Sequence, residues 1–329
     1  MTSDVAETAG PAPEDFAGPS PAHTLKRLFH ATRPKFFPAS VLPVLAGSAW
    51  GFMSAGAFEI SVFLLALLAT VCVHGGANVL NDVGDDAGGT DRLNNDRIYP
   101  YTGGSRFIQS GIMSADGMAR LGVSLLAIAA VAGLMLLTLK GAMILWFGIA
   151  GVMLAVLYSL GPVRLSSIGL GETAVGFAFG VLPVTGAAWL QSDAISTDLL
   201  LFALPISSWV AAILLINEVP DIGADGATGK RTLPVRLGHT GTALLYAAIH
   251  LFAAGIVTAL TVRGALPILT PLVPVVLLVL AFRAARAIRY GVRDRVAMTG
   301  AIEATIGIHT VGSLWLTAAA LYAAFWGAA

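Results

Sequence analysis

The sequence predicts an all-α, polytopic membrane protein with nine transmembrane helices around a central cavity that opens to the cytoplasmic side. Composition gives the first indication: hydrophobic residues make up 56% of the 329 residues and charged residues only 12%, whereas soluble domains carry about 25% charged residues. The apolar residues also gather in runs of about 18 or more, the length that an α-helix needs to cross a bilayer.

Nine such runs occur along the chain, and each predicts one membrane-spanning helix. The eighth run contains Pro267, Pro271 and Pro274, but neighbouring helices can satisfy the backbone groups that a proline frees. The predicted spans are 36–56, 60–82, 117–139, 141–160, 169–191, 198–219, 241–262, 265–282 and 302–326.

The first 24 residues differ in composition from the rest. They contain Pro11, Pro13, Pro19 and Pro21, scattered acids and almost no large apolar residues, which predicts a disordered cytoplasmic tail over residues 1–24. No Lys or Arg precedes an apolar core in this segment, so it is not typical of a signal peptide. Residues 25–329 are expected to form a single transmembrane domain.

The basic residues predict the orientation. If the N-terminus is cytoplasmic, the nine spans leave only Lys140 and Arg263 of the 19 Lys and Arg residues on the outside. Because Lys and Arg concentrate in cytoplasmic loops, we expect a cytoplasmic N-terminus and an external C-terminus, in the plasma membrane of a bacterium. A basic run is expected to be topological and lipid-facing on the cytoplasmic side: Arg283, Arg286, Arg289, Arg293 and Arg295.

Charge and cysteine content exclude two classes of function. The formal net charge is zero, and no basic stripe is present that would neutralise the phosphates of a nucleic acid. Cys72 is the only cysteine and lies in an apolar run, so a disulfide framework and a thiolate metal site are both excluded.

Acidic and amide residues gather at two places, each at the cytoplasmic end of an apolar run. The first is the stretch NVLNDVGDDAGGTD. Residues four apart share one face of a helix, so Asn78 and Asp82 form a stripe with His74. Ionisable groups cost on the order of 2.5–3.5 kcal/mol each at mid-bilayer, so their retention indicates a function. The first cluster consists of Asn78, Asn81, Asp82, Asp85, Asp86 and Asp91.

The second cluster lies in INEVPDIGADGATGKRTLPVRLG and contains Asn217, Glu218, Asp221 and Asp225. Its members also recur at helical spacing, although Pro220 must kink or restart the helix there. Two oxygen-rich faces at the ends of two helices can therefore face each other across a helix bundle.

Hard oxygen ligands of this kind suit Mg²⁺, and two opposed clusters would cage a magnesium diphosphate. Metal ions offset the repulsion between the carboxylates and the diphosphate, and cationic side chains at the rim would complete the neutralisation. Stabilised in this way, diphosphate can leave an allylic carbon, and the resulting carbocation can be captured by an electron-rich ring. The candidate rim cations are Lys35, Arg97, Arg106, Lys230, Arg231 and Arg236.

These motifs resemble a known family. N-D-x-x-D-x-x-x-G-x-D is present as Asn81, Asp82, Asp85, Gly89 and Asp91, and N-x-x-x-D-x-x-x-D as Asn217, Asp221 and Asp225. Further matches are RPK at 33–35, GLGE at 169–172 and GKRTLPVRLG at 229–238. From about Thr32 to its C-terminus, the chain is similar to the UbiA superfamily of intramembrane aromatic prenyltransferases, most closely to the 1,4-dihydroxy-2-naphthoate polyprenyltransferases of menaquinone synthesis.

The resemblance implies a Mg²⁺-dependent enzyme, with Mn²⁺ as a substitute, that transfers a polyprenyl group from its diphosphate to an aromatic acceptor. The metal ligands that it implies are Asn81, Asp82, Asp85 and Asp91 on one side and Asn217, Asp221 and Asp225 on the other. Of these, the expected catalytic residues are Asp82, Asp85, Asp221 and Asp225. The expected substrate-binding residues are Lys35, Asn78, Arg97, Arg106, Tyr158, Lys230 and Arg231.

Two departures from the family pattern bear on this assignment. The common superfamily spacing fits the first cluster only as Asn78, Asp82 and Asp86, in a shifted register. The register from Asn81 matches the naphthoate branch at every motif position, and it leaves Asp86 without a role. The stretch YTGGSR at 101–106 also differs from the basic stretch of that branch.

Several residues have a structural alternative to a functional role. Asp86, Asp91 and Asp96 are expected to lie in a loop, where solvated acids are common. His74 is expected to be a hydrogen-bonded histidine of the core or the cavity and not a metal ligand. Tyr158 either anchors the chain at the membrane interface or lines the cavity. Glu172 either touches the acceptor or begins a helix, where the dipole favours an acid.

Two further functions stay open at this point. The donor chemistry would be unchanged with another acceptor, such as 4-hydroxybenzoate, another quinone precursor, a tetrapyrrole or a lipid. A member of a different class would be an ion-coupled transporter, although transporters bind substrate near the bilayer midplane, whereas the acids here lie at the cytoplasmic helix ends.

Overall fold

The computed structural model describes residues 10–88, 97–159 and 164–327 of the chain. Throughout these ranges the regular structure is helical, and no strand occurs in them. The predicted all-α fold class is therefore confirmed.

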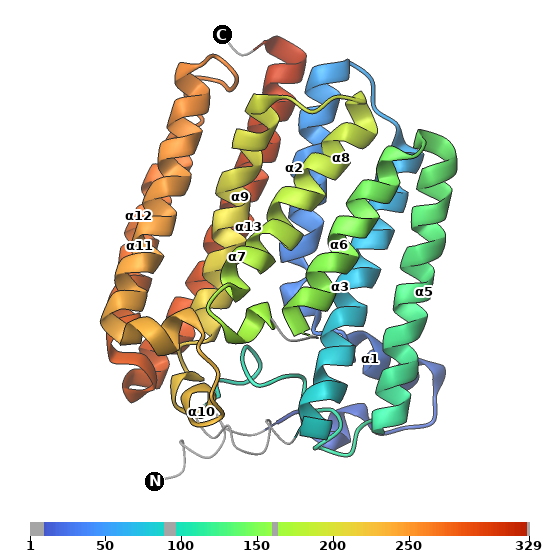
Figure 1. Ribbon diagram of the computed structural model, residues 1–329, viewed down its shortest axis with the longest axis vertical. Helices are drawn as coiled ribbons and strands as arrows, with labels where there is room; N and C mark the ends of the chain where they lie inside the picture. The colour runs from blue at the N-terminus through green and yellow to red at the C-terminus, as the bar shows by residue number, and fades with distance from the viewer. Residues whose placement is uncertain (1–9, 89–96, 160–163, 328–329) are drawn as a thin grey trace.

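Long helices run side by side along the longest axis of the molecule, as Figure 1 shows. They are α2 (Pro38–Ala55), α3 (Ile60–Gly88), α5 (Ala115–Lys140), α6 (Met143–Ser159), α9 (Thr197–Asn217), α11 (Leu233–Val262), α12 (Leu272–Tyr290) and α13 (Arg295–Trp326). One further rod is composite and joins α7 (Gly171–Gly176), the π-helix η4 (Phe177–Val181) and α8 (Leu182–Ser192). The short helices are η1 (Pro13–Phe16), α1 (Pro21–Ala31), η2 (Pro34–Phe36), η3 (Leu165–Ser167), α10 (Ile222–Ala227) and η5 (Gly291–Asp294).

Six helices among the described residues are long and apolar enough to cross a membrane. The chain is thus a multi-pass membrane protein. A further apolar helix, Met143–Tyr158, is shorter, and α12 carries Arg283, Arg286 and Arg289 in its second half. The six are Pro34–Ala55, Ile60–Ala87, Ala115–Lys140, Gly171–Ser192, Thr197–Asn217 and Leu233–Val262.

The outer surfaces of these helices are apolar. On α5, Val131 and Leu134 are 58% and 61% exposed, whereas Ala129 and Ala132 on the opposite side are buried. Water would penalise such a continuous apolar surface, but lipid does not. The helix therefore faces lipid with its large side chains and faces its neighbours with its small ones.

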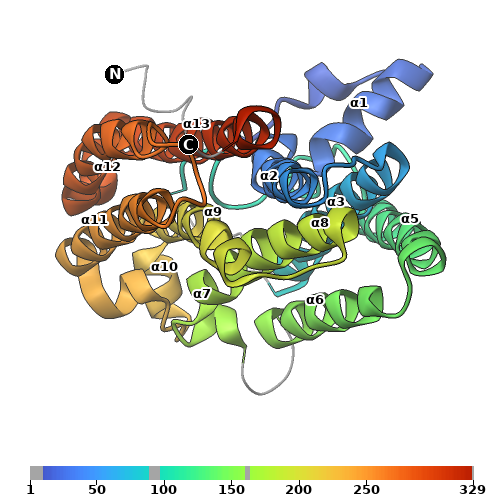
Figure 2. The same cartoon turned by 90° about the horizontal axis from the view of Figure 1, so that it is seen from above.

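Glycines set the register between the composite rod and α9. A Cβ atom on Gly180 would lie 2.3 Å from Ser207 Cα, and one on Gly176 would lie 3.0 Å from Ser207 O. Small residues allow helix backbones to approach closely in membranes, and the π-helix lies at this contact. The start of α7 is thereby brought to the end of α9. Figure 2 shows α7 and α9 as neighbours when the molecule is seen from above.

The N-terminal segment corrects one expectation. Residues 1–9 lie outside the described residues, but residues 13–24 of the predicted disordered tail include η1 and the first turn of α1. Phe16 is buried, and its ring meets that of Phe107 at 5.0 Å between centroids. Arg27 donates hydrogen bonds to the carbonyls of Phe16 and Gly18. The buried Phe16 ring and the Arg27 hydrogen bonds hold this segment in place, and composition reveals neither contact.

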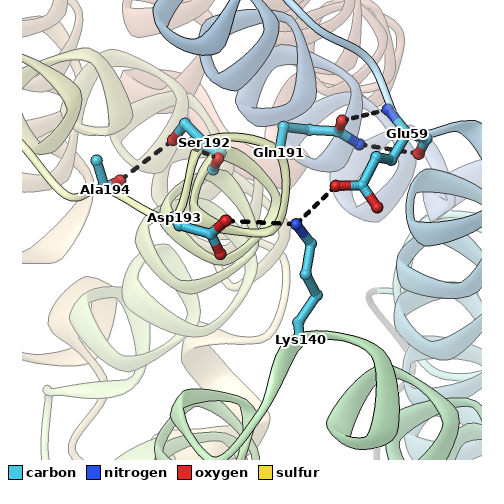
Figure 3. A network of polar contacts seen from close by, with 7 residues as sticks. Glu59, Lys140, Gln191, Ser192, Asp193 and Ala194 are labelled. Carbon is cyan, nitrogen blue, oxygen red and sulfur yellow. Dashed lines mark hydrogen bonds and ion pairs between the residues drawn. The ribbon is translucent and has the colours of Figure 1, made fainter.

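A polar cluster ties three helices together at the end of the bundle where α3 begins (Figure 3). Lys140 Nζ lies 2.7 Å from Glu59 Oε1 and 3.6 Å from Asp193 Oδ2, and the Lys140 side chain is only 9% exposed. Gln191 accepts a hydrogen bond from the Glu59 N–H and donates one to the Glu59 carbonyl. We refer to Glu59, Lys140, Gln191 and Asp193 as the Lys140 clamp.

Candidate active site

The first acidic motif occupies the last turns of α3, which stays helical past the predicted span to Gly88. Asp82 is buried, at 3% exposure. Its Oδ2 accepts a hydrogen bond from the Ser105 N–H at 2.9 Å. Its Oδ1 is buried and has no hydrogen-bond partner in the described structure. A buried carboxylate oxygen without a partner is costly unless a ligand or cation binds it.

Asn81 and Asp85 are paired one helical turn apart. The Asn81 side-chain amide donates to Asp85 Oδ2 at 2.7 Å, which holds the carboxylate in place. Asp85 also interacts electrostatically with Lys230 and Arg33. Asp91 lies outside the described residues, as does Asp96.

Two other polar residues of α3 bind neighbouring segments. The Asn78 amide donates to the Thr32 carbonyl at 3.0 Å, and Gln109 donates to Asp86 Oδ1 at 3.1 Å. Asn78 and Asp86 are the residues that the shifted register would use.

The loop 97–114 covers the first motif and is anchored on two sides. Besides the Ser105 bond to Asp82, the Tyr101 hydroxyl donates to Glu303 Oε1 on α13 at 2.8 Å. Burial and the Glu303 carboxylate raise the pKa of Tyr101 to about 12, so the hydroxyl stays a donor at neutral pH. Lys35 Nζ lies 5.1 Å from the centre of the Tyr101 ring. The YTGGSR stretch is thus part of the site.

The second motif is divided between two helices, because α9 ends at Asn217 and α10 begins after Asp221. The predicted restart of the helix at Pro220 is confirmed. Asn217 Oδ1 is buried and has no hydrogen-bond partner in the part of the chain that is described. Asp225 is 7% exposed, and its Oδ1 pairs with Lys230 Nζ at 3.2 Å.

Lys230 connects the two motifs. It interacts electrostatically with Asp225 and Asp221 of the second motif and with Asp85 of the first. Burial lowers the pKa of Lys230, but the three carboxylates more than offset this effect, so its pKa lies above the usual value. Lys230 is therefore protonated at neutral pH, and the two motifs lie within electrostatic range of one cation.

The other predicted cations are held in different ways. The Arg97 carbonyl accepts a hydrogen bond from Arg295 at 2.6 Å, and Arg106 has a left-handed backbone with φ 63°. The Arg231 N–H donates to the Ser167 carbonyl, and its own carbonyl accepts from Arg236 Nε, both at 2.8 Å. These bonds shape the loops around the site.

The donor set fits a hard cation. Across the described ranges, no group of three or more His, Cys, Asp and Glu side chains is arranged to hold a metal ion by itself. Among the buried oxygens without a hydrogen-bond partner, Asp82 Oδ1 and Asn217 Oδ1 come one from each motif. Mg²⁺ takes few protein ligands and completes its shell with water and phosphate oxygens, so an open pair of oxygen-bearing faces suits it.

Sequence reasoning left out Arg33, which the structure places at the site. Arg33 interacts with Asp85, and its guanidinium donates to the Tyr101 carbonyl at 3.4 Å. It stands in the left-handed region, with φ 59°. The RPK motif was the available signal, since a non-glycine residue in this conformation is uncommon and often functional.

Two buried glutamates lie beside the second motif. Glu172 at the start of α7 is 3% exposed, and Glu218 after α9 is 9% exposed. Burial raises the pKa of Glu218, and the neighbouring Glu172 carboxylate raises it further. The two side chains lie within hydrogen-bonding distance of each other. Glu218 was assigned to the second cluster without a role, and nothing in the sequence pairs it with Glu172.

The structure distinguishes between the alternative roles of His74 and Tyr158. His74 is buried between the rings of Phe37 and Phe179, 5.7 Å and 4.8 Å away, and bonds to Ser40, so it is a core histidine. Tyr158 interacts electrostatically with Glu172 and Glu218 as well as with Asp85 and Asp225. It therefore belongs to the site.

A sequence profile described as the UbiA prenyltransferase family matches residues 40–302, which include both motifs. The chain belongs to this family. It is accordingly a prenyltransferase, and UbiA membership decides against the transporter alternative.

Individual UbiA relatives agree with this assignment. The chain is 33% identical over 225 residues to the 1,4-dihydroxy-2-naphthoate octaprenyltransferase of Escherichia coli, covering 66% of this chain and 70% of that one. It is 32% identical over 262 residues to the enzyme of the same name from Mycobacterium tuberculosis, covering 79% and 85%. The structure of a UbiA homologue from Archaeoglobus fulgidus bound to GPP and Mg²⁺ superposes with a TM-score of 0.60 at 14% identity, covering 90% of this chain and 99% of that one.

Proposed function

We propose that this UbiA-family enzyme transfers a polyprenyl group to 1,4-dihydroxy-2-naphthoate, with Mg²⁺ as its cofactor and with loss of CO₂ and diphosphate, to give demethylmenaquinone in its reduced, quinol form. The donor half rests on one observation: each motif presents a buried oxygen without a partner, and Lys230 interacts with both motifs. The acceptor half is supported by the relatives named 1,4-dihydroxy-2-naphthoate octaprenyltransferase. The transmembrane prenyltransferase domain would extend over residues 25–329.

The motif residues would hold the metal. When bound, Mg²⁺ supplies the positive charge that makes diphosphate a good leaving group. Lys230 donates charge-assisted hydrogen bonds to the phosphate oxygens, and Lys35, Arg97, Arg106 and Arg231 add positive charge at the rim, while Asn78 and Tyr158 help to shape the site. The proposed ligands are Asn81, Asp82, Asp85, Asp91, Asn217, Asp221 and Asp225, and Mn²⁺ is expected to substitute.

The acceptor chemistry needs little from the protein beyond placement. The dihydroxynaphthoate ring is electron-rich, and loss of CO₂ removes the substituent at the attacked carbon, so a strong general base is not required. The protein holds the ring against the carbocation and limits access of competing water.

Purified enzyme supplied with Mg²⁺, a mixture of prenyl diphosphates and carboxyl-labelled 1,4-dihydroxy-2-naphthoate is expected to release labelled CO₂ in step with prenylated product. Mass spectrometry of the products identifies the prenyl chain length. A parallel panel contains 4-hydroxybenzoate and aromatic rings without a carboxylate. Prenylation without CO₂ release, or a preference for another acceptor, contradicts the acceptor assignment and leaves the donor chemistry intact.

The finer fold assignment is also a proposal: nine spans, with the motif ends in the cytoplasm, the C-terminus outside and a central cavity opening to the cytoplasmic side. It is supported by the distribution of Lys and Arg. In a Cys72→Ala background, an impermeant thiol reagent applied to spheroplasts is expected to modify Ala57→Cys but not Ala227→Cys. Both alanines are exposed and lie outside the candidate spans. The reverse labelling pattern contradicts the orientation.

A further inference from the structure

Glu172 is the most conspicuous unpartnered group in the described structure. Only 3% of the Glu172 surface is exposed to solvent. Neither Oε1 nor Oε2 accepts a hydrogen bond from a donor group in the described residues. Oε2 of Glu218, which is also buried, lacks a partner as well. Glu172 and Glu218 can share one hydrogen bond with each other, which leaves at least one Glu172 oxygen without a donor. Buried polar atoms in folded proteins are nearly always hydrogen-bonded, so this oxygen indicates a ligand that donates a hydrogen bond.

The packing of α7 against α9 fixes Glu172 at this position. Gly180 and Gly176 approach Ser207, and a Cβ on Gly176 would also lie 3.2 Å from the Ala211 side chain. Continuing along the two antiparallel helices brings Glu172 to the end of α9, where Glu218 follows Asn217. The glutamate is thus held by rigid helix packing, which is the arrangement expected of a recognition residue.

Tyr158 relates this pair to the reacting groups. Its ring packs beside Gly171, where a Cβ would lie 3.7 Å from Tyr158 Cε2. It interacts electrostatically with Glu172 and Glu218 and also with Asp85 and Asp225. The glutamates therefore border the site of prenyl transfer without belonging to either metal-binding motif.

We propose that Glu172 accepts a hydrogen bond from a ring hydroxyl group of the aromatic acceptor. This inference rests on the proposed function and adds a residue that selects hydroxylated rings. A diphosphate is disfavoured as the ligand, because its oxygens accept hydrogen bonds and offer no donor to an unpartnered carboxylate oxygen.

The hydrogen bond also has a chemical consequence. When a carboxylate accepts a hydrogen bond from a phenolic O–H, the phenolic oxygen donates more electron density into the ring. The proton stays on the phenolic oxygen in this arrangement. The acceptor's own carboxylate would point away from the glutamates and toward the cationic side of the site, where Lys230 lies. Acceptors without the hydroxyl would leave Glu172 unpartnered, and sites of this kind discriminate strongly against such analogues.

Binding of 1,4-dihydroxy-2-naphthoate, 1-hydroxy-2-naphthoate and 4-hydroxy-2-naphthoate to the full-length protein in micelles tests this proposal. Equilibrium dialysis without a prenyl donor avoids any dependence on turnover. Wild-type protein is expected to bind the dihydroxy compound about tenfold or more tightly than one of the monohydroxy compounds, the scale of a hydrogen bond to a charged group. Glu172→Leu is expected to abolish this preference, and Glu172→Gln to weaken it.

Glu14→Gln, which changes an exposed glutamate of η1, is the matched control and should keep the wild-type preference. The ligand-free Glu172→Leu variant should melt no lower than wild type, because an apolar residue replaces a buried, unpartnered carboxylate. If the folded Glu172→Leu and Glu172→Gln variants keep the wild-type preference for the dihydroxy compound, the role of Glu172 is overturned and the proposed function is unaffected. Failure of the wild-type protein to bind or prenylate any hydroxylated aromatic acceptor overturns the proposed function together with it.

Discussion

Asp82→Ala is expected to reduce prenyl transfer by about a hundredfold or more, the scale of removing one strong electrostatic contact to a transition state. Asp82 presents a buried oxygen without a partner at the centre of the first motif. Initial rates of product formation in detergent micelles measure the effect. Similar losses are expected for the corresponding alanine variants of Asp85, Asp221 and Asp225, because each removes an oxygen ligand and little core packing.

Asp82 has a second role that must be separated from the first, because its Oδ2 also accepts the Ser105 N–H and so anchors the loop 97–114. Asp82→Asn keeps an oxygen for Ser105 but loses the charge, so it should be nearly as inactive as Asp82→Ala while keeping the wild-type melting temperature. Asp116→Ala, an exposed aspartate at the start of α5, serves as the control. Near wild-type rates in two or more of the four motif variants would contradict the metal assignment.

Removal of divalent cations is expected to abolish prenyl transfer. Both motifs supply only hard oxygen ligands, and the single cysteine, Cys72, is buried elsewhere in an apolar helix. The cation that the motifs favour is therefore Mg²⁺ or Mn²⁺. Without it, the carboxylates repel the diphosphate and the leaving group is not neutralised. Rates are measured after exhaustive chelation and again after graded addition of Mg²⁺, Mn²⁺ or Ca²⁺.

Recovery with Mg²⁺ and with Mn²⁺ is the expected outcome of this titration. The melting temperature of the ligand-free protein should change little, since among the described residues no closed metal site holds the fold together. Full turnover by chelated enzyme would rule out the proposed cofactor, and recovery with Ca²⁺ alone would contradict the assignment to Mg²⁺ or Mn²⁺.

Local patterns predicted the parts of the site that lie within one segment of the chain. The spacing of Asn81, Asp82 and Asp85 follows from helical periodicity, and Pro220 predicted the break between α9 and α10, because proline lacks the N–H that a helix interior requires. Apolar run length likewise placed the long helices, although α3 continues six residues beyond the predicted end at residue 82.

Contacts between distant segments could not be predicted in this way. The bond from Ser105 to Asp82, the approach of Glu172 to Glu218 and the burial of Phe16 against Phe107 all depend on which helices pack together. Periodicity tells which face of a helix is buried, but not what covers it. A single sequence holds no information on the partner when the two segments are separated by loops of variable length.

The Lys140 clamp has a mechanical consequence for these contacts. At 1.5 Å per residue, Glu59 lies roughly 35 Å from Asp82 along α3, so the clamp fixes α3 at the end remote from the motifs. The other end of α3 is held as well, because Asn78 binds the Thr32 carbonyl and Asp82 accepts the Ser105 N–H. Polar contacts thus hold α3 at both ends, and the first motif keeps its height along the axis of the bundle.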